Sequence, residues 1–173
     1  MNFIKCIVLT AAVVGFFVGT ADAQRRKIVR PKPVVVTSNV SPATELKMGA
    51  DKVSIQIKNV TKFIFVLGGV ASGIEAIDKE AKTKKVAKAT LDQNELNKKS
   101  VIQAIRNLRA GLAALEVEFR TKNALKKFIP QIGGIADLTA RSEDAAFSGK
   151  FTASGQPLIM VVEKLSDALA AMP

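Results

Sequence analysis

Histidine is absent from this 173-residue sequence, and cysteine occurs once, as Cys6. Histidine is the side chain most used for acid–base chemistry near neutral pH, and its imidazole is a common ligand of zinc and copper. A single cysteine cannot form a disulfide within the chain or supply the several thiolates of a structural zinc site. These absences count against an enzyme, and we expect no cofactor and no metal.

Tryptophan and tyrosine are also absent, so the nine phenylalanines are the only aromatic residues. Tryptophan and tyrosine are the usual anchors of protein-binding surfaces, and aromatic rings stack on single-stranded bases. The formal net charge is nevertheless +11, which favours anionic partners such as lipid headgroups, anionic polysaccharides or acidic proteins. We expect no nucleic acid partner, because stacking residues are scarce and an export signal begins the chain.

Residues 1–23 have the three parts of a secretory signal peptide. One lysine precedes fifteen uncharged, mostly apolar residues, and the sequence Ala21-Asp22-Ala23 follows. The apolar run is shorter than the roughly 20 residues that cross a membrane, and the small residues suit a signal peptidase. We therefore predict cleavage between Ala23 and Gln24, and a secreted or periplasmic mature protein. Cys6 leaves with the signal peptide.

A basic arm that contains prolines follows at residues 24–40. Pro31 and Pro33 prevent a helix and favour an extended chain, so we predict a flexible arm. Its cations are expected to bind an anionic surface, and the alternative is a spacer between signal and domain. These cations are Arg25, Arg26, Lys27, Arg30 and Lys32.

Residues 41–173 carry the periodicity of helices. Ser41 suits a helix cap and Pro42 suits the first helical position. Apolar residues then recur at steps of four and three, which predicts a long helix with one buried stripe over residues 42–82. The stripe consists of Leu46, Ala50, Val53, Ile57, Val60, Ile64, Leu67, Ala71 and Ile74.

Twelve uncharged residues, 63–74, lie inside this helix. Gly68, Gly69 and Gly73 each lower helix stability by roughly 1 kcal/mol relative to alanine, which indicates a kink or a close helix contact. Gly69 and Gly73 have the spacing of packed membrane helices, but twelve residues are too few to span a bilayer. We interpret the stretch as the buried centre of the helix and keep membrane contact as the alternative.

A second long helix is predicted from Thr90, which with Gln93 resembles a capping box. It ends near Arg120 or continues to Phe128, before Pro130. Its apolar stripe consists of Val101, Ile105, Leu108, Leu112, Leu115 and Phe119. A lysine-rich connection at residues 79–88 joins it to the first helix.

The remaining residues predict two shorter helices. A short helix is expected over residues 130–138, loosened by Gly133-Gly134, then a loop over residues 143–155 and a last helix from Pro157. The predicted fold class is all-α, a three- or four-helix bundle with two long amphipathic helices, within a domain of residues 41–173. We expect Ile57, Ile64, Ile105 and Leu112 to be buried, and Lys58, Lys99 and Lys126 to be exposed.

The sequence contains only incomplete versions of catalytic and ligand-binding motifs. Gly68 and Gly73 have the spacing of a phosphate loop, but the lysine and the hydroxyl residue that must follow are missing. Four carboxylates form neighbouring pairs without the pattern of a calcium loop, and we interpret them as surface acids. They are Glu116, Glu118, Glu143 and Asp144.

The sequence therefore predicts an exported, non-catalytic helical binding or structural protein of the cell envelope or the extracellular space. Its expected partner is a protein or an anionic surface. The alternative is a peripheral membrane or pore-related protein that uses the basic arm and residues 63–74. An enzyme with an unrecognised carboxylate or lysine site is the third hypothesis.

Overall fold

The computed structural model describes residues 41–173, which form helices joined by short connections and contain no strand. The elements in order are α1 (Pro42–Thr83), α2 (Lys88–Thr121), a 3-10 turn η1 (Lys126–Phe128), α3 (Ile129–Ile132), α4 (Ile135–Phe147) and α5 (Gly155–Ala171). The predicted all-helical fold class is confirmed for these residues. The predicted signal peptide and the basic arm lie outside the described part.

Helix α1 begins as predicted. The Ser41 side chain accepts a hydrogen bond from the Thr44 amide at 3.2 Å, and Pro42 occupies the first turn. The helix continues for 42 residues without interruption. The close helix contact expected at its glycines is wrong for the described fold, because no atom of another helix lies within 4 Å of an ideal Cβ at Gly68, Gly69 or Gly73.

Helix α2 begins two residues before the predicted cap. Its N-cap is Ala87, which provides no side-chain hydrogen bond, so the capping-box interpretation of Thr90 was wrong. The helix ends at Thr121 because Lys122 is extended, with φ −85° and ψ 124°. The alternative in which α2 continues to Phe128 is therefore also wrong.

The predicted third helix is divided, and the predicted loop is partly helical. Gly134 separates α3 from α4 with φ 86°, a left-handed conformation that glycine adopts without a steric penalty. Helix α4 then continues to Phe147. Two buried residues hold this last part in place: Ser142 Oγ donates to the Ser154 carbonyl at 2.7 Å, and Glu143 binds arginines of α2. These tertiary contacts override a local composition that is typical of a loop.

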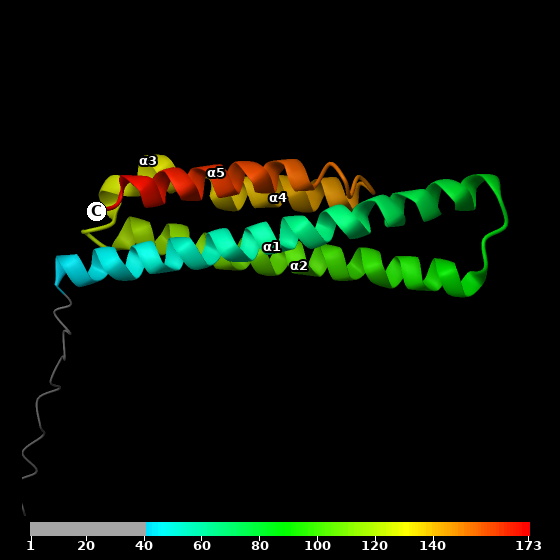
Figure 1. Cartoon of the computed structure of the whole chain (residues 1–173), viewed down its shortest axis with the longest axis horizontal. Helices are drawn as coiled ribbons and strands as arrows, with labels where there is room; N and C mark the ends of the chain where they lie inside the picture. Colours follow the sequence, from blue (N-terminus) through cyan, green and yellow to red (C-terminus); the bar gives the residue numbers. More distant parts are fainter. Residues whose placement is uncertain (1–40) are drawn as a thin grey trace, which may run out of the picture. The chain divides into compact units, whose positions relative to one another are not determined.

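Helices α1 and α2 form an antiparallel pair, with α5 packed against α1 and α4 packed against α2 (Figure 1). Helices α4 and α5 also contact each other, so each of these four helices packs against two of the other three, and the short α3 packs against α5 and α2. The core of this arrangement contains Ile105 and Leu112, both fully buried as predicted. Lys58, Lys99 and Lys126 are exposed, also as predicted.

Two of the predicted core residues, Ile57 and Ile64, are only half-buried. Four buried positions of α1 recur every seven residues, which is close to two helical turns. Ile57 and Ile64 are offset by four residues from this series and are partly exposed, whereas the smaller Ala71 at the same offset is buried. The series consists of Val53, Val60, Leu67 and Ile74.

The connection between α4 and α5 is attached to α1 through Glu75. This carboxylate accepts hydrogen bonds from the Thr152 amide at 2.8 Å and from the Thr152 hydroxyl at 3.0 Å. Beyond this contact, α1 and α2 continue past the α4–α5 connection and end in their own turn (Figure 1).

Candidate functional site

Residues 63–74 divide between two faces of α1. Leu67, Ala71 and Ile74 are buried, so the interpretation of the stretch as core is correct for one face. On the opposite face the Phe65 side chain is 85% exposed and Val66 is 58% exposed. We call this opposite face the outer α1 face. It consists of Phe65, Val66, Gly68, Gly69, Ser72 and Gly73, all exposed.

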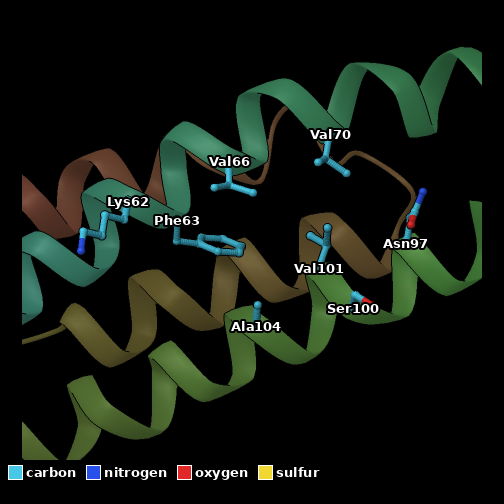
Figure 2. A pocket seen from close by; sticks show the side chains of 8 residues that line it. All are labelled: Lys62, Phe63, Val66, Val70, Asn97, Ser100, Val101 and Ala104. Atoms are coloured by element: carbon cyan, nitrogen blue, oxygen red, sulfur yellow. The ribbon is translucent and has the colours of Figure 1, made fainter.

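An apolar groove of about 450 Å³ lies beside this face, between α1 and α2. Figure 2 shows side chains of both helices bordering it, with Phe63, Val66 and Val70 from α1 and Val101 and Ala104 from α2. We call it the hairpin groove. Its full lining is Lys62, Phe63, Val66, Val70, Asn97, Ser100, Val101 and Ala104.

The groove results from unequal side chains on its two walls. The α1 wall presents large apolar residues at steps of three and four, which place them on one side of a helix. The α2 wall presents Ser100 and Ala104 at these levels. The two small side chains of the α2 wall leave an open seam whose polar side chains are Lys62, Asn97 and Ser100.

Lysines flank the outer α1 face on the same side of the helix. Lys58, Phe65, Ser72 and Lys79 are separated by seven residues each, and all four are exposed. Seven residues make nearly two turns, so these side chains point in similar directions, with about 10 Å between successive members along the axis. A projecting phenyl ring is therefore bracketed by two ammonium groups.

The wider region around this face has an excess of positive charge. Residues 58–88 contain seven lysines and three acids. Each acid has a partner: Glu75 binds the α4–α5 connection, Asp78 pairs with Lys98 at 2.7 Å, and Glu80 pairs with Lys84 at 3.6 Å. Six of the seven lysines form no ion pair within residues 41–173. They are Lys58, Lys62, Lys79, Lys82, Lys85 and Lys88.

Glu143 is a buried acid, so its interpretation as a surface acid was wrong. Only 7% of the residue is exposed, and its carboxylate accepts hydrogen bonds from Arg106 Nε at 2.6 Å and from Arg109 at 3.3 Å. The Arg106 hydrogen bond outweighs burial and, with Arg109, holds the pKa of Glu143 below its usual range. Arg106 also stacks on Phe147 at 4.9 Å.

Glu116 and Glu118 are likewise engaged inside the fold, whereas Asp144 is exposed as expected. Buried Glu116 accepts hydrogen bonds from the Ala136 amide at 3.0 Å and from Arg120 at 3.3 Å. Glu118 pairs with two lysines, Lys52 and Lys122. Burial alone would raise the pKa of Glu118, but the hydrogen bonds from these lysines outweigh it and lower the pKa.

These hydrogen bonds and ion pairs give the carboxylates a structural role, because they join helices to one another. An ionised carboxylate between two cations is a poor general acid, because its pKa lies far from neutral pH. Within residues 41–173, no three side chains among histidine, cysteine, aspartate and glutamate are placed to hold a metal ion.

One stretch of α1 is long and apolar enough to cross a membrane by length and composition alone, and 22% of that stretch is buried in the described fold. The sequence interpretation missed the exposed side of this stretch. The seven-residue series Lys58, Phe65, Ser72 and Lys79 carried the signal, since Phe65 is its one large apolar member and lysines stand at both ends. The predicted binding residues Arg25, Arg26, Lys27, Arg30 and Lys32 lie outside the described residues.

Comparisons with protein-family models, with curated proteins and with solved structures found no match for this chain.

Proposed function

We propose that this chain is an exported, non-catalytic helical binding protein of the cell envelope or the extracellular space. Its helices act as a bundle that presents the outer α1 face and the hairpin groove to a partner. The observation that carries this proposal is the exposure of Phe65 in an uncharged face of α1, where it is the most exposed large apolar side chain of the described residues. Large apolar surfaces that the fold leaves uncovered are commonly sites of interaction.

Two further observations support a binding role. The carboxylates Glu116, Glu118 and Glu143 are each bound to cations or amides of the fold, so they favour stability over catalysis. The ring of contacts among α1, α2, α4 and α5 supports a rigid scaffold behind the outer α1 face. Rigid elements present a binding surface at a low entropic cost.

The proposal is tested by photo-crosslinking in the cells that make the protein. A photoreactive phenylalanine analogue at position 65 should form one discrete adduct, whereas the same analogue at exposed Ser166 on α5 should form none. The adduct at position 65 should disappear in a chain with Gly69→Glu, because the new side chain covers the face with a negative charge and has open space around its Cβ. Equal labelling at both positions, or none at either, would contradict the proposed binding surface.

Export is tested separately from binding. Mass spectrometry of the chain recovered outside the cytoplasm should give a mature N-terminus at Gln24, after removal of residues 1–23. Recovery of the uncleaved chain in the cytoplasm would contradict the export signal. It would not bear on the binding surface, which the crosslinking experiment tests.

A peripheral membrane or pore-related role is the second candidate. It is favoured by the lysines that bracket Phe65, because a basic face with a projecting aromatic residue is typical of helices that lie in a membrane interface.

A further inference from the structure

Phe65 projects from a part of α1 that leaves it unshielded. The ring is 85% exposed, and no atom lies within 4 Å of the Cβ positions that a side chain would occupy at Gly68 or Gly69. The residues one turn later therefore add no bulk beside the ring. A phenyl group in this setting can enter another apolar phase without displacing neighbouring side chains.

The cations near the ring are directed to the same side and have no ion-pair partner within residues 41–173. Lys58 and Lys79 precede and follow Phe65 in the seven-residue series, and Lys62 lies at the end of the hairpin groove. The acids of this region are occupied by other contacts, as described above. The outer α1 face therefore combines an apolar centre with a positive border.

We propose that the outer α1 face docks on an anionic bilayer surface, with Phe65 and Val66 entering the headgroup region. Lys58, Lys62 and Lys79 bind the lipid phosphates, and their long side chains let the ammonium groups stay at the headgroups while the ring lies deeper. Each such lysine adds to the attraction of an anionic leaflet. This inference rests on the proposed binding function and names its partner.

The charge distribution favours a bilayer over an acidic protein helix seated in the hairpin groove. A helix in that groove would meet both walls, but the α2 wall presents Asn97, Ser100 and Ala104 and no cation. The unpaired lysines Lys58 and Lys79 instead lie on the same exposed side of α1 as Phe65. A flat anionic surface can therefore contact the ring and the lysines that border it at the same time.

The same geometry favours an interfacial position over a transmembrane one. Leu67, Ala71 and Ile74 face the core of residues 41–173, so only one side of α1 is available to lipid. An amphipathic helix with one apolar side lies in the interface plane. Crossing the bilayer would require α1 to leave α2 and α5, which cover its other sides.

The first experiment measures partitioning of the mature chain, recovered after export, onto vesicles. Phosphatidylcholine vesicles with about 30% phosphatidylglycerol should bind it, and pure phosphatidylcholine should bind it weakly. Phe65→Ser should lower the partition coefficient about tenfold, in line with burial of one phenyl ring. The matched control is Phe147→Ser, because Phe147 is 55% exposed on α4. Equal losses in both variants would overturn the proposal.

The second experiment reports the position of the ring directly. Since the sequence has no tryptophan and no tyrosine, Phe65→Trp introduces a single fluorophore. Its emission should shift to the blue on anionic vesicles and be quenched by brominated acyl chains, whereas Phe147→Trp should show neither effect. Binding without quenching at position 65 would mean that another region, such as the basic arm, holds the chain on the vesicle, and it would overturn the proposal. This outcome can be read even if Phe65→Ser folds poorly, because it does not depend on that variant.

The third experiment separates this inference from the proposed function. The double variant Lys58→Gln/Lys79→Gln should weaken binding to anionic vesicles at least fivefold. The control is Lys126→Gln/Lys150→Gln, which removes the same charge from exposed positions elsewhere and should have a smaller effect. A discrete protein adduct at position 65, with no vesicle binding by the mature chain, would refute the lipid surface and leave the binding function standing. If neither double variant changes vesicle binding, the proposed lipid-docking surface is also refuted.

Discussion

Asn94, which is buried in α2, donates a hydrogen bond from Nδ2 to the main-chain oxygen of Ile74 in α1 at 3.3 Å. The same nitrogen donates to Asp78 Oδ1 at 2.8 Å. Asp78 also pairs with Lys98, and although burial lowers the pKa of Lys98, hydrogen bonds to Asp78 and Glu95 outweigh it and raise the pKa. These directional bonds set the register of α1 against α2 near their turn, since a shift of one residue would break them.

The substitution Asn94→Asp should destabilise the fold by about 1–3 kcal/mol, the cost of leaving buried polar groups without partners. It replaces the donor with an acceptor that faces the Ile74 oxygen and the Asp78 carboxylate. Urea unfolding near neutral pH measures the effect. Gln93→Glu is the control, because Gln93 is the exposed neighbour and bonds only to Asn97. Similar stability of the two variants would show that Asn94 does not fix the register.

The sequence predicted the long helices and the centre of the core because both depend on local periodicity. The step of four and three placed Ile105 and Leu112 correctly, and Ser41-Pro42 marked the start of α1. Periodicity does not distinguish the centre of a buried stripe from its edge. The burial of Ile57 and Ile64 was therefore overestimated, since it depends on where α5 and α2 meet α1.

Buried ion pairs were not predictable from the sequence for a different physical reason. Glu143 begins a stretch, residues 143–155, that is rich in serine, glycine and alanine, a composition typical of a loop. It becomes helical and buried only because Arg106 and Arg109, far away in the chain, reach it from α2. The outer α1 face was missed likewise, because the twelve uncharged residues alone do not indicate which side α5 leaves uncovered, and only the longer series from Lys58 to Lys79 does so.

Ile105→Ala should reduce the free energy of unfolding by about 2–5 kcal/mol, as expected for a large core side chain that leaves a cavity. Ile105 is fully buried, whereas Ile55 is 52% exposed on α1. Ile55→Ala should therefore cost less than about 1 kcal/mol. Chemical denaturation of both variants measures the difference, and an unchanged midpoint for Ile105→Ala would show that the α2 stripe does not form the core.

Gly69→Ala should stabilise α1 by up to about 1 kcal/mol, because alanine is the better helix former and its Cβ meets open space. Gly49→Ala is the matched comparison within the same helix. Its Cβ would lie 2.6 Å from Leu125 Cδ2, and Leu125 is fully buried. Overpacking of about 1–3 kcal/mol should cancel the helix gain there. Thermal unfolding that ranks the two variants in the opposite order would contradict this packing.

Glu143→Gln should destabilise the fold at neutral pH by about 1–3 kcal/mol, because it weakens hydrogen bonds between charged groups. The pKa of Glu143 lies below the ordinary value of 4.5 in the folded chain. Its carboxylate therefore stabilises the fold above about pH 4.5, and this contribution is lost as the pH falls through the lowered pKa.

The difference in unfolding free energy between the parent chain and Glu143→Gln should thus be greatest at neutral pH and approach zero in acid. Asp144→Asn serves as the control, because Asp144 is exposed beside Glu143. It should show little pH-dependent difference. A difference for Glu143→Gln that persists unchanged at low pH would assign its effect to packing and contradict the ionic role.

The basic arm should supply an electrostatic part of membrane binding that differs in kind from the contribution of Phe65. Five cations lie within the first ten residues of the predicted mature chain. Each could contribute about 1 kcal/mol near an anionic leaflet. A chain that begins at Val34 should therefore bind anionic vesicles more weakly than residues 24–173 at low salt, and the two should converge at high salt, because exposed charges are screened over about 8 Å at physiological ionic strength.

A full-length mature chain with glutamine at all five cationic positions separates charge from length. If the arm acts through its charge, this chain should bind like the one that begins at Val34. If the arm is only a spacer, it should bind like the parent chain at every salt concentration. Because Lys58, Lys62 and Lys79 remain in this chain, the blue shift of Phe65→Trp should persist in it at low salt, and it should weaken at high salt, where these lysines are screened as well. Loss of that shift at low salt in the chain with five glutamines would show that Phe65 reaches the bilayer only when the arm holds the chain there.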